Sequence, residues 1–80
     1  MLKNGYQLYA ARALTGLSQV QLAKFSGLSA TAIVALERKR EASLSGSSVN
    51  TLTRIEKVLT DHGVRLIETH DGTGAVRIHA

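Results

Sequence analysis

The side chains with the clearest chemistry in this sequence are three consecutive cations near the middle of the chain, Arg38, Lys39 and Arg40. The surrounding half of the chain is also the more basic one. Residues 1–40 carry six Lys or Arg side chains against one acidic residue, whereas residues 41–80 carry four against five. Clustered guanidinium and ammonium groups bind phosphate oxygens and release the counterions of a polyanion. The charge distribution therefore indicates a polyanion-binding surface in the first half of the chain.

The sequence offers little for catalysis or metal binding. His62, His70 and His79 stand eight and nine positions apart, a spacing that fits no metal-binding motif, and the chain contains no cysteine. No serine lies in a nucleophile-elbow pattern, and the glycines form no loop that would cradle a phosphate. A chain of 80 residues also leaves little room for a deep pocket. We expect no enzymatic activity, no metal and no cofactor.

Two short helices are expected directly before the basic run, over residues 19–26 and 30–38. Ser18 and Ser29 are suitable N-caps, because a serine hydroxyl accepts from the free amides of a first helical turn. Gly27 lies where the first helix must end in a left-handed conformation, which glycine adopts without steric cost. Apolar residues recur three positions apart in both helices, and small residues stand where the helices would cross. The expected inward residues are Leu22, Phe25, Ile33 and Leu36, and the small ones are Ala23 and Ala32.

This pattern predicts a helix-turn-helix, whose second helix enters the major groove of DNA. The rival interpretation is an ordinary helical hairpin with a glycine corner. The stretch from about residue 7 to residue 63 resembles the lambdoid phage repressor and Cro family, the Xre-type helix-turn-helix regulators. The residues that carry the resemblance are Arg12, Gln19, Leu22, Ala23, Gly27, Ser29, Ile33, Leu36 and Glu37.

The resemblance implies a mainly α fold, a four-helix λ-repressor-like helix-turn-helix domain over residues 1–63. It also implies that Gln19 hydrogen-bonds a DNA phosphate and braces the recognition helix, and that Arg12 pairs with Glu37. We expect this ion pair to be partly buried, fixing the first helix of the domain against the recognition helix. The residues expected to contact DNA phosphates are Gln19, Ser29, Lys39 and Arg40.

The outward face of the helix over residues 30–38 is the expected base-reading surface. The family places Gln, Arg or Lys at the positions of Ala30, Thr31 and Ala35, and this sequence departs from that pattern. Small side chains contact thymine methyl groups but cannot form bidentate hydrogen bonds to bases. We therefore expect sites rich in A·T steps that are recognised through DNA shape; the alternative is that this apolar face binds a protein. The expected base-reading residues are Ala30, Thr31, Val34, Ala35 and Arg38.

The rest of the chain is expected to supply the core and a C-terminal extension. The expected segments are a loose arm over residues 1–5, a first helix over 6–15, a surface loop over 41–47 and a fourth helix over 49–62. The expected inward residues of the first helix are Leu8, Ala11 and Leu14, and those of the fourth are Val49, Leu52, Ile55 and Leu59, with Val58 beside them.

Residues 64–80 depart from a purely helical repressor. Residues 64–69 are rich in β-branched side chains and residues 75–79 alternate in polarity, with a strong turn signal at Asp71-Gly72 between them. They predict a C-terminal β-hairpin belonging to the same domain. An exposed strand edge is a template for a second chain, so we expect the hairpin to support a homodimer. The expected dimer contacts are Val64, Leu66, Val76 and Ile78.

These features together predict a sequence-specific DNA-binding transcriptional regulator, a repressor that binds an inverted-repeat operator as a homodimer. The resemblance implies repression and a frequent origin on phages or other mobile elements, with contact to RNA polymerase as a route to activation. The alternative is an antitoxin-like or other protein-binding module on a helix-turn-helix scaffold. No apolar run is long enough to span a membrane and no signal-peptide pattern opens the chain, so we expect a cytoplasmic protein.

Overall fold

The computed structural model describes residues 1–78, which form four helices followed by a two-stranded antiparallel hairpin. The elements are α1 (Gly5–Thr15), α2 (Gln19–Ser26), α3 (Ala30–Arg38), α4 (Val49–Asp61), β1 (Val64–Thr69) and β2 (Gly72–Arg77). None of these helices is long and apolar enough to cross a membrane. The chain therefore has a mainly α body with a small β extension, as the sequence predicts.

Each helix begins at a polar side chain that accepts a hydrogen bond from its first turn. Asn4 caps α1, and serines cap the other three helices: Ser18 before α2, Ser29 before α3 and Ser48 before α4. Such caps satisfy backbone amides that have no partner within the helix. Because caps are local, the expected bounds of α2 and α3 are correct to the residue, and α1 and α4 differ from expectation by one residue at one end each.

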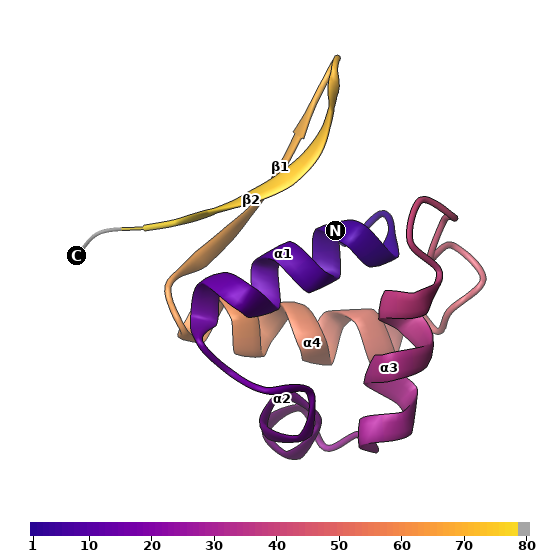
Figure 1. Ribbon diagram of the computed structural model, residues 1–80, viewed down its shortest axis with the longest axis vertical. Coiled ribbons are helices and arrows are strands. Elements are labelled where there is room, and N and C mark those ends of the chain that lie inside the picture. The colour runs from indigo at the N-terminus through magenta and orange to yellow at the C-terminus, as the bar shows by residue number, and fades with distance from the viewer. Residues whose placement is uncertain (79–80) are drawn as a thin grey trace.

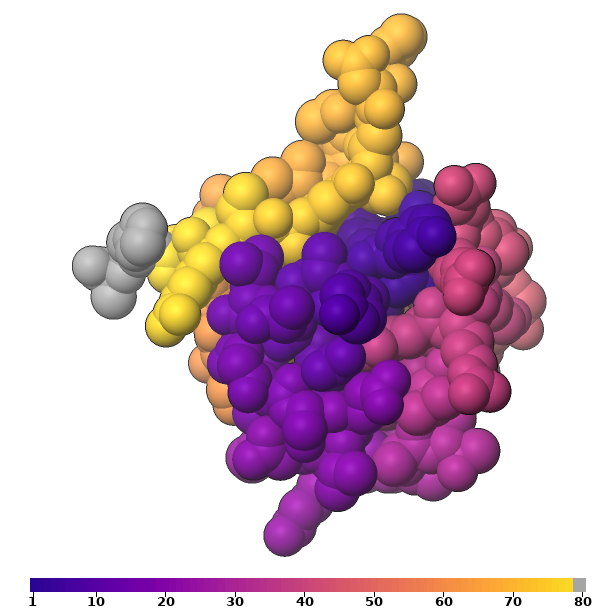
Figure 2. Space-filling view, in the orientation of Figure 1, coloured from indigo at the N-terminus to yellow at the C-terminus, as the bar shows by residue number. Residues whose placement is uncertain are grey.

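The hairpin lies across α1, and its tip projects beyond the helices (Figures 1 and 2). Its strands pair from Val64↔Arg77 to Thr69↔Gly72. The turn therefore consists of His70 and Asp71 alone, and the expected Asp71-Gly72 turn is displaced by one residue. The glycine-rich stretch that follows belongs to the ladder, so β2 starts before the expected residue 75. His79, the expected last strand residue, lies outside the described residues.

The core forms where α1, α2, α3 and α4 meet and extends beneath the hairpin through Val64. A leucine of the α3–α4 connection, Leu44, is fully buried, so this segment is more than the expected surface loop. Phe25 and Val49 were expected to face inward but are 61% and 66% exposed. The largest fully buried side chains are Leu8, Leu22, Ile33, Leu44, Ile55 and Leu59.

The two outward apolar residues have separate explanations. On α2, the inward positions are taken by Leu22 and by Ser26 one turn later, and Ser26 is buried with its hydroxyl bonded to the Leu22 carbonyl at 2.7 Å. Phe25 is thereby turned out, where its ring packs on His62 at a centroid distance of 5.3 Å. Val49 is the first residue of α4, and the buried stripe of that helix starts one turn later at Leu52.

The N-terminal segment is part of the fold, and the expected loose arm is wrong. Leu2 is 3% exposed and belongs to the core. The Lys3 carbonyl accepts from the Leu44 amide at 2.9 Å, and Asn4 forms a β-bridge with Ser43. The apolar side chain of Leu2 is buried only because this segment folds back on the helices. The α3–α4 connection supplies the hydrogen-bond partners for its backbone.

Candidate nucleic-acid interface

The junction between α2 and α3 is a tight turn that fixes the start of α3 against α2. Gly27 has a φ of 72°, in the left-handed region that a residue with a Cβ rarely adopts. The amide of Leu28 donates to the Ala23 carbonyl at 2.9 Å, and Ala23 is buried where a larger side chain would separate the helices. Ser29 then caps α3 through the Ala32 amide at 3.1 Å. The orientation of α3 is therefore set by backbone geometry.

A polar network beneath α3 holds the end of that helix. The guanidinium of Arg12 on α1 donates to both carboxylate oxygens of Glu37, at 2.6 Å from Nε and 3.1 Å from Nη2. A third hydrogen bond joins Arg12 Nη1 to the Leu17 carbonyl at 3.0 Å. Nε2 of Gln19, the first residue of α2, donates to the same Glu37 carboxylate at 3.1 Å. The ion pair expected between Arg12 and Glu37 is thus present, and it joins three helices.

Burial makes this network a strong constraint. The side chains of Arg12 and Glu37 are 14% and 5% exposed, so water competes little for their hydrogen bonds. The hydrogen bonds to Glu37 raise the pKa of Arg12 above its ordinary value, against an opposing effect of desolvation. The only acid of the first half of the chain is therefore neutralised by Arg12. The exposed positive charge around α3 comes from Arg38 at its end and from Lys39 and Arg40 directly after it.

The structure places the expected base-reading residues of α3 in two groups. Thr31, Ala35 and Arg38 are exposed and lie along one line of the helix surface. Val34 is half-buried, and Ala30 is also half-buried because it packs against the core. The exposed surface of α3 is therefore narrower than the sequence suggests, because Ala30 and Val34 are partly covered by the rest of the domain.

The residues expected to contact phosphates differ in how firmly they are held. Ser29 is exposed, and Gln19 is half-buried with its amide already bonded to Glu37. Lys39 is exposed at the C-cap of α3. Arg40 has a φ of 52°, and its backbone is bonded at both ends, the amide to the Glu37 carbonyl and the carbonyl to the Tyr6 amide, each at 3.1 Å. Gln19 and Arg40 border one depression beside α3, whereas Ser29 and Lys39 lie at opposite ends of that helix.

Two tyrosines outside the expected site lie next to this surface. Tyr6 and Tyr9 on α1 are 51% and 57% exposed. They border a depression between α1 and α3 whose other lining residues include Val34, Arg38 and Arg40. A sequence signal exists, since two tyrosines three positions apart share one face of the expected first helix, but nothing in the sequence indicates that this face adjoins the end of α3.

The residues expected to form a dimer contact lie on opposite faces of the hairpin. Val64 is 3% exposed and belongs to the core, and Leu66 packs against the core. Val76 pairs with Arg65 in the ladder and is 38% exposed, and Ile78 is 41% exposed. Paired residues share a face and successive residues alternate, so Val76 faces away from the helices. Ile78, beyond the end of β2, borders a depression together with Glu56 and Thr60 of α4. Val64 is unavailable as a dimer contact, because its side chain is already buried within its own chain.

The two described histidines occupy separate places. His62 caps α4 with Nδ1 2.8 Å from the Val58 carbonyl, and His70 is at the hairpin tip; His79 lies outside the described residues. Within residues 1–78, no three His, Cys, Asp or Glu side chains come together to hold a metal ion.

No protein-family model matches the chain, and no curated protein matches it.

Proposed function

We propose that this protein is a sequence-specific DNA-binding transcriptional regulator of the helix-turn-helix type, with α3 as its recognition helix. The observation that carries the proposal is the buried network of Arg12, Glu37 and Gln19, which fixes α3 from below and leaves its outer line of residues exposed. A recognition element needs this combination of a rigid support and a free surface, because disorder in the free protein lowers affinity.

The dimensions and charge of α3 fit a major groove. A helix of nine residues is about 13 Å long, and the groove is about 12 Å wide. Arg38 ends the helix, and Lys39 and Arg40 follow it, so the cations are available to the phosphates that border the groove. Phosphate contacts of this kind position a protein on DNA, whereas base contacts carry the sequence specificity.

The base contacts available to α3 are few. Thr31 offers a hydroxyl and a methyl group, Ala35 offers a methyl group, and Arg38 offers hydrogen-bond donors that suit guanine. Short side chains favour contact with thymine methyl groups and a close approach of the helix to the groove. Much of the specificity is therefore assigned to the shape and deformability of an A·T-rich site.

A homodimer on an inverted repeat completes the proposal. Two recognition helices about 34 Å apart would reach successive major grooves on one side of DNA. The surfaces proposed to meet the second copy are the outer face of the hairpin at Val76, the exposed side chain of Ile78 and the outer edge of β1. Occupation of a promoter by such a dimer would repress transcription.

The test is selection of duplexes from a random library by the purified full chain, followed by footprinting of the selected site. The expected result is an A·T-rich inverted repeat with half-sites one helical turn apart, and a dimer by analytical ultracentrifugation. Thr31→Ala and Ala35→Ser are expected to change the selected sequence rather than abolish binding. A protein that stays monomeric and binds no duplex at low ionic strength would contradict the proposal.

A protein-binding module of the antitoxin type is the second candidate. It is favoured by the large apolar side chains left exposed on the helices, since Val20, Phe25 and Val49 are each more than 60% exposed. Such a module would lose a protein complex on Phe25→Ser while keeping its affinity for DNA. The regulator proposed above predicts instead that substitutions on α3 weaken DNA binding and that no protein complex depends on Phe25.

A further inference from the structure

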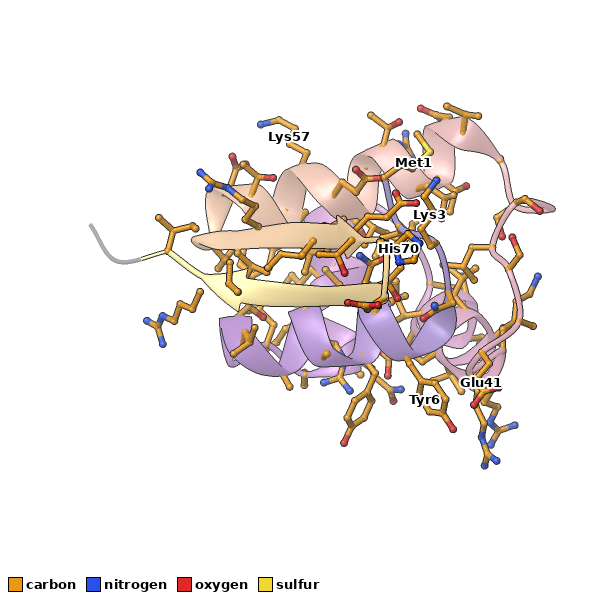
Figure 3. The ribbon with its side chains drawn as sticks, turned by 90° about the horizontal axis from the view of Figure 1, so that it is seen from above. Met1, Lys3, Tyr6, Glu41, Lys57 and His70 are labelled. Atoms are coloured by element: carbon orange, nitrogen blue, oxygen red, sulfur yellow. The ribbon has the colours of Figure 1, made fainter. Side chains whose placement is uncertain are left out.

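The depression between α1 and α3 has a composition that DNA reading by α3 does not require. It has a volume of about 480 Å³ and opens to solvent. Tyr6 and Tyr9 form its α1 side, and Val34, Arg38 and Arg40 form its α3 side. It therefore combines two exposed phenol rings with two guanidinium groups. Figure 3 shows Tyr6 directed away from the hairpin, at the edge of the molecule where Glu41 also lies.

The two sides of the depression are fixed to each other by the backbone. A Cβ on Gly5 would lie 2.6 Å from the Arg40 amide nitrogen and from the carbonyl oxygens of Leu36 and Glu37. Only glycine permits the start of α1 to approach the end of α3 this closely. The Tyr6 amide then donates to the Arg40 carbonyl at 3.1 Å. The backbone segments that carry the tyrosines and the arginines are consequently held against each other without any ligand.

Arg40 and Tyr9 are each held by neighbouring groups. Arg40 directly follows the C-cap of α3 and adopts a left-handed backbone with a φ of 52°, the conformation that commonly ends a helix. The Tyr9 ring lies against the guanidinium of Arg12, with 5.4 Å between the guanidinium carbon and the ring centroid. Because Arg12 is locked by Glu37, the orientation of Tyr9 depends on the same network that supports α3.

The charge around the depression suits an anion. Glu37 is the one acid among its lining residues, and its carboxylate is already bonded to Arg12 and Gln19. The run from Arg38 to Glu41 carries three positive charges and one negative charge. An occupant that offers both an anionic group and an apolar surface would match the guanidinium groups and the tyrosine rings together. A sugar–phosphate backbone alternates these two features.

We propose that this depression binds the sugar–phosphate backbone of the DNA strand that borders the groove occupied by α3. This inference rests on the proposed function and assigns α1 a direct part in it. One phosphate accepts hydrogen bonds from the Arg40 guanidinium and from the hydroxyl groups of Tyr6 and Tyr9, while the tyrosine rings pack against deoxyribose. Arg38 and Val34 link this site to the exposed face of α3, so the two contacts are continuous.

The experiment compares the wild-type full chain with the double variant Tyr6→Phe, Tyr9→Phe on a selected duplex and on an unrelated duplex of the same length. Both rings are exposed, so the substitution removes two hydroxyl groups and leaves packing intact, which circular dichroism can verify. We expect affinity to fall at least about tenfold, because a single lost hydrogen bond to a charged group already has about that effect. The loss should be equal on the two duplexes, because a phosphate contact carries no sequence information.

The salt dependence of DNA affinity distinguishes the contribution of the tyrosine hydroxyl groups from that of the Arg40 charge. The tyrosine variant should keep the wild-type slope of log affinity against log salt, since the removed groups are neutral, whereas Arg40→Gln should lower that slope by about 0.9. A duplex with a neutral methylphosphonate at the contacted position should bind the tyrosine variant and the wild type equally. Thr53→Val is the matched control, because it removes one exposed hydroxyl from α4, outside the depression.

The outcomes distinguish this inference from the function on which it rests. If the wild type binds the selected duplex and the tyrosine variant binds it equally well, the backbone site is elsewhere and α3 alone remains the proposed contact. A tenfold loss confined to the selected duplex would also overturn the inference, since it would indicate base readout. A wild type that binds no duplex would overturn both proposals.

Discussion

The α3 side and the hairpin side of this protein are attached to the helical body by different chemistry. Beneath α3, a charged pair with side chains 14% and 5% exposed joins α1 to α3. Beneath the hairpin, the neutral amide of Gln7 takes that place. Its Nε2 donates to the carbonyl oxygens of Ile67 and Gly74 at 3.1 and 3.0 Å, and the residue is 2% exposed.

This difference has an energetic consequence. A buried charge that loses its partner is costly, because neither water nor the protein compensates it. A neutral amide that is removed leaves unpartnered backbone groups, which cost less. The surface contacts of the hairpin, such as the pair between Lys3 and Glu68 at 3.5 Å, are half-exposed and add little. We therefore expect α3 to come away only when the whole domain unfolds, whereas the hairpin can open locally while the helices stay folded.

The largest effect is expected from Glu37→Gln. The substitution preserves the shape of the side chain but leaves the guanidinium of Arg12 buried without a countercharge. We expect a loss of about 3 kcal/mol of unfolding free energy, equivalent to a fall of roughly 15 °C in Tm for a domain of this size. Urea and thermal denaturation followed by circular dichroism measure it. If Glu37→Gln lowers the unfolding free energy no more than a substitution in an exposed ion pair does, the network does not hold α3 in place.

Gln7→Leu is expected to cause the next largest loss of unfolding free energy, and the loss should act mainly on the hairpin. The Lys3 amide, which donates to Gln7 Oε1 at 2.8 Å, and the two hairpin carbonyls lose their partner. We expect a loss of about 2 kcal/mol, with faster amide hydrogen exchange over residues 64–77 than over α3. Equal acceleration in α3 and in the hairpin would contradict the proposed independence of the two sides.

Arg38→Gln extends the comparison to DNA binding. We expect a loss of about 1 kcal/mol, or fivefold in affinity, and a salt slope reduced by about 0.9, measured by fluorescence anisotropy at several salt concentrations. Arg77→Gln on the hairpin is the control, since it removes the same exposed charge from the other side. Equal losses in both variants would mean that net charge alone, rather than the surface around α3, binds the duplex.

The smallest effect is expected from Lys57→Gln. The pair of Lys57 with Asp61 on α4 has an N–O distance of 3.1 Å, but its side chains are 75% and 58% exposed. Lys57 also lies at the edge opposite Tyr6 and Glu41 (Figure 3). The stability change should stay within about 0.5 kcal/mol. If Lys57→Gln lowers the unfolding free energy nearly as much as Glu37→Gln does, burial does not explain why the Arg12–Glu37 pair matters more than the Lys57–Asp61 pair.

Several features of the fold were predictable because they depend on neighbours in the chain. A serine before a helix and a glycine after it act within one turn, which is why α2 and α3 begin and end at the expected residues. The Arg12–Glu37 pair was expected from the resemblance to known regulators. The direction of Phe25 was not predictable, because the three-residue spacing from Leu22 is equally compatible with Ser26 taking the inward position.

The amino-acid sequence by itself determined the order of the elements, the ends of α2 and α3, and the excess of positive charge around α3. Only the tertiary structure decided that Leu2 and Leu44 join the core, that the expected dimer residues divide between two faces of the hairpin, and that Tyr6 and Tyr9 face Arg40. The physical reason is one of range. Caps and periodicity act over a few residues, whereas the approach of Gly5 to Arg40 brings together groups that are far apart in the chain.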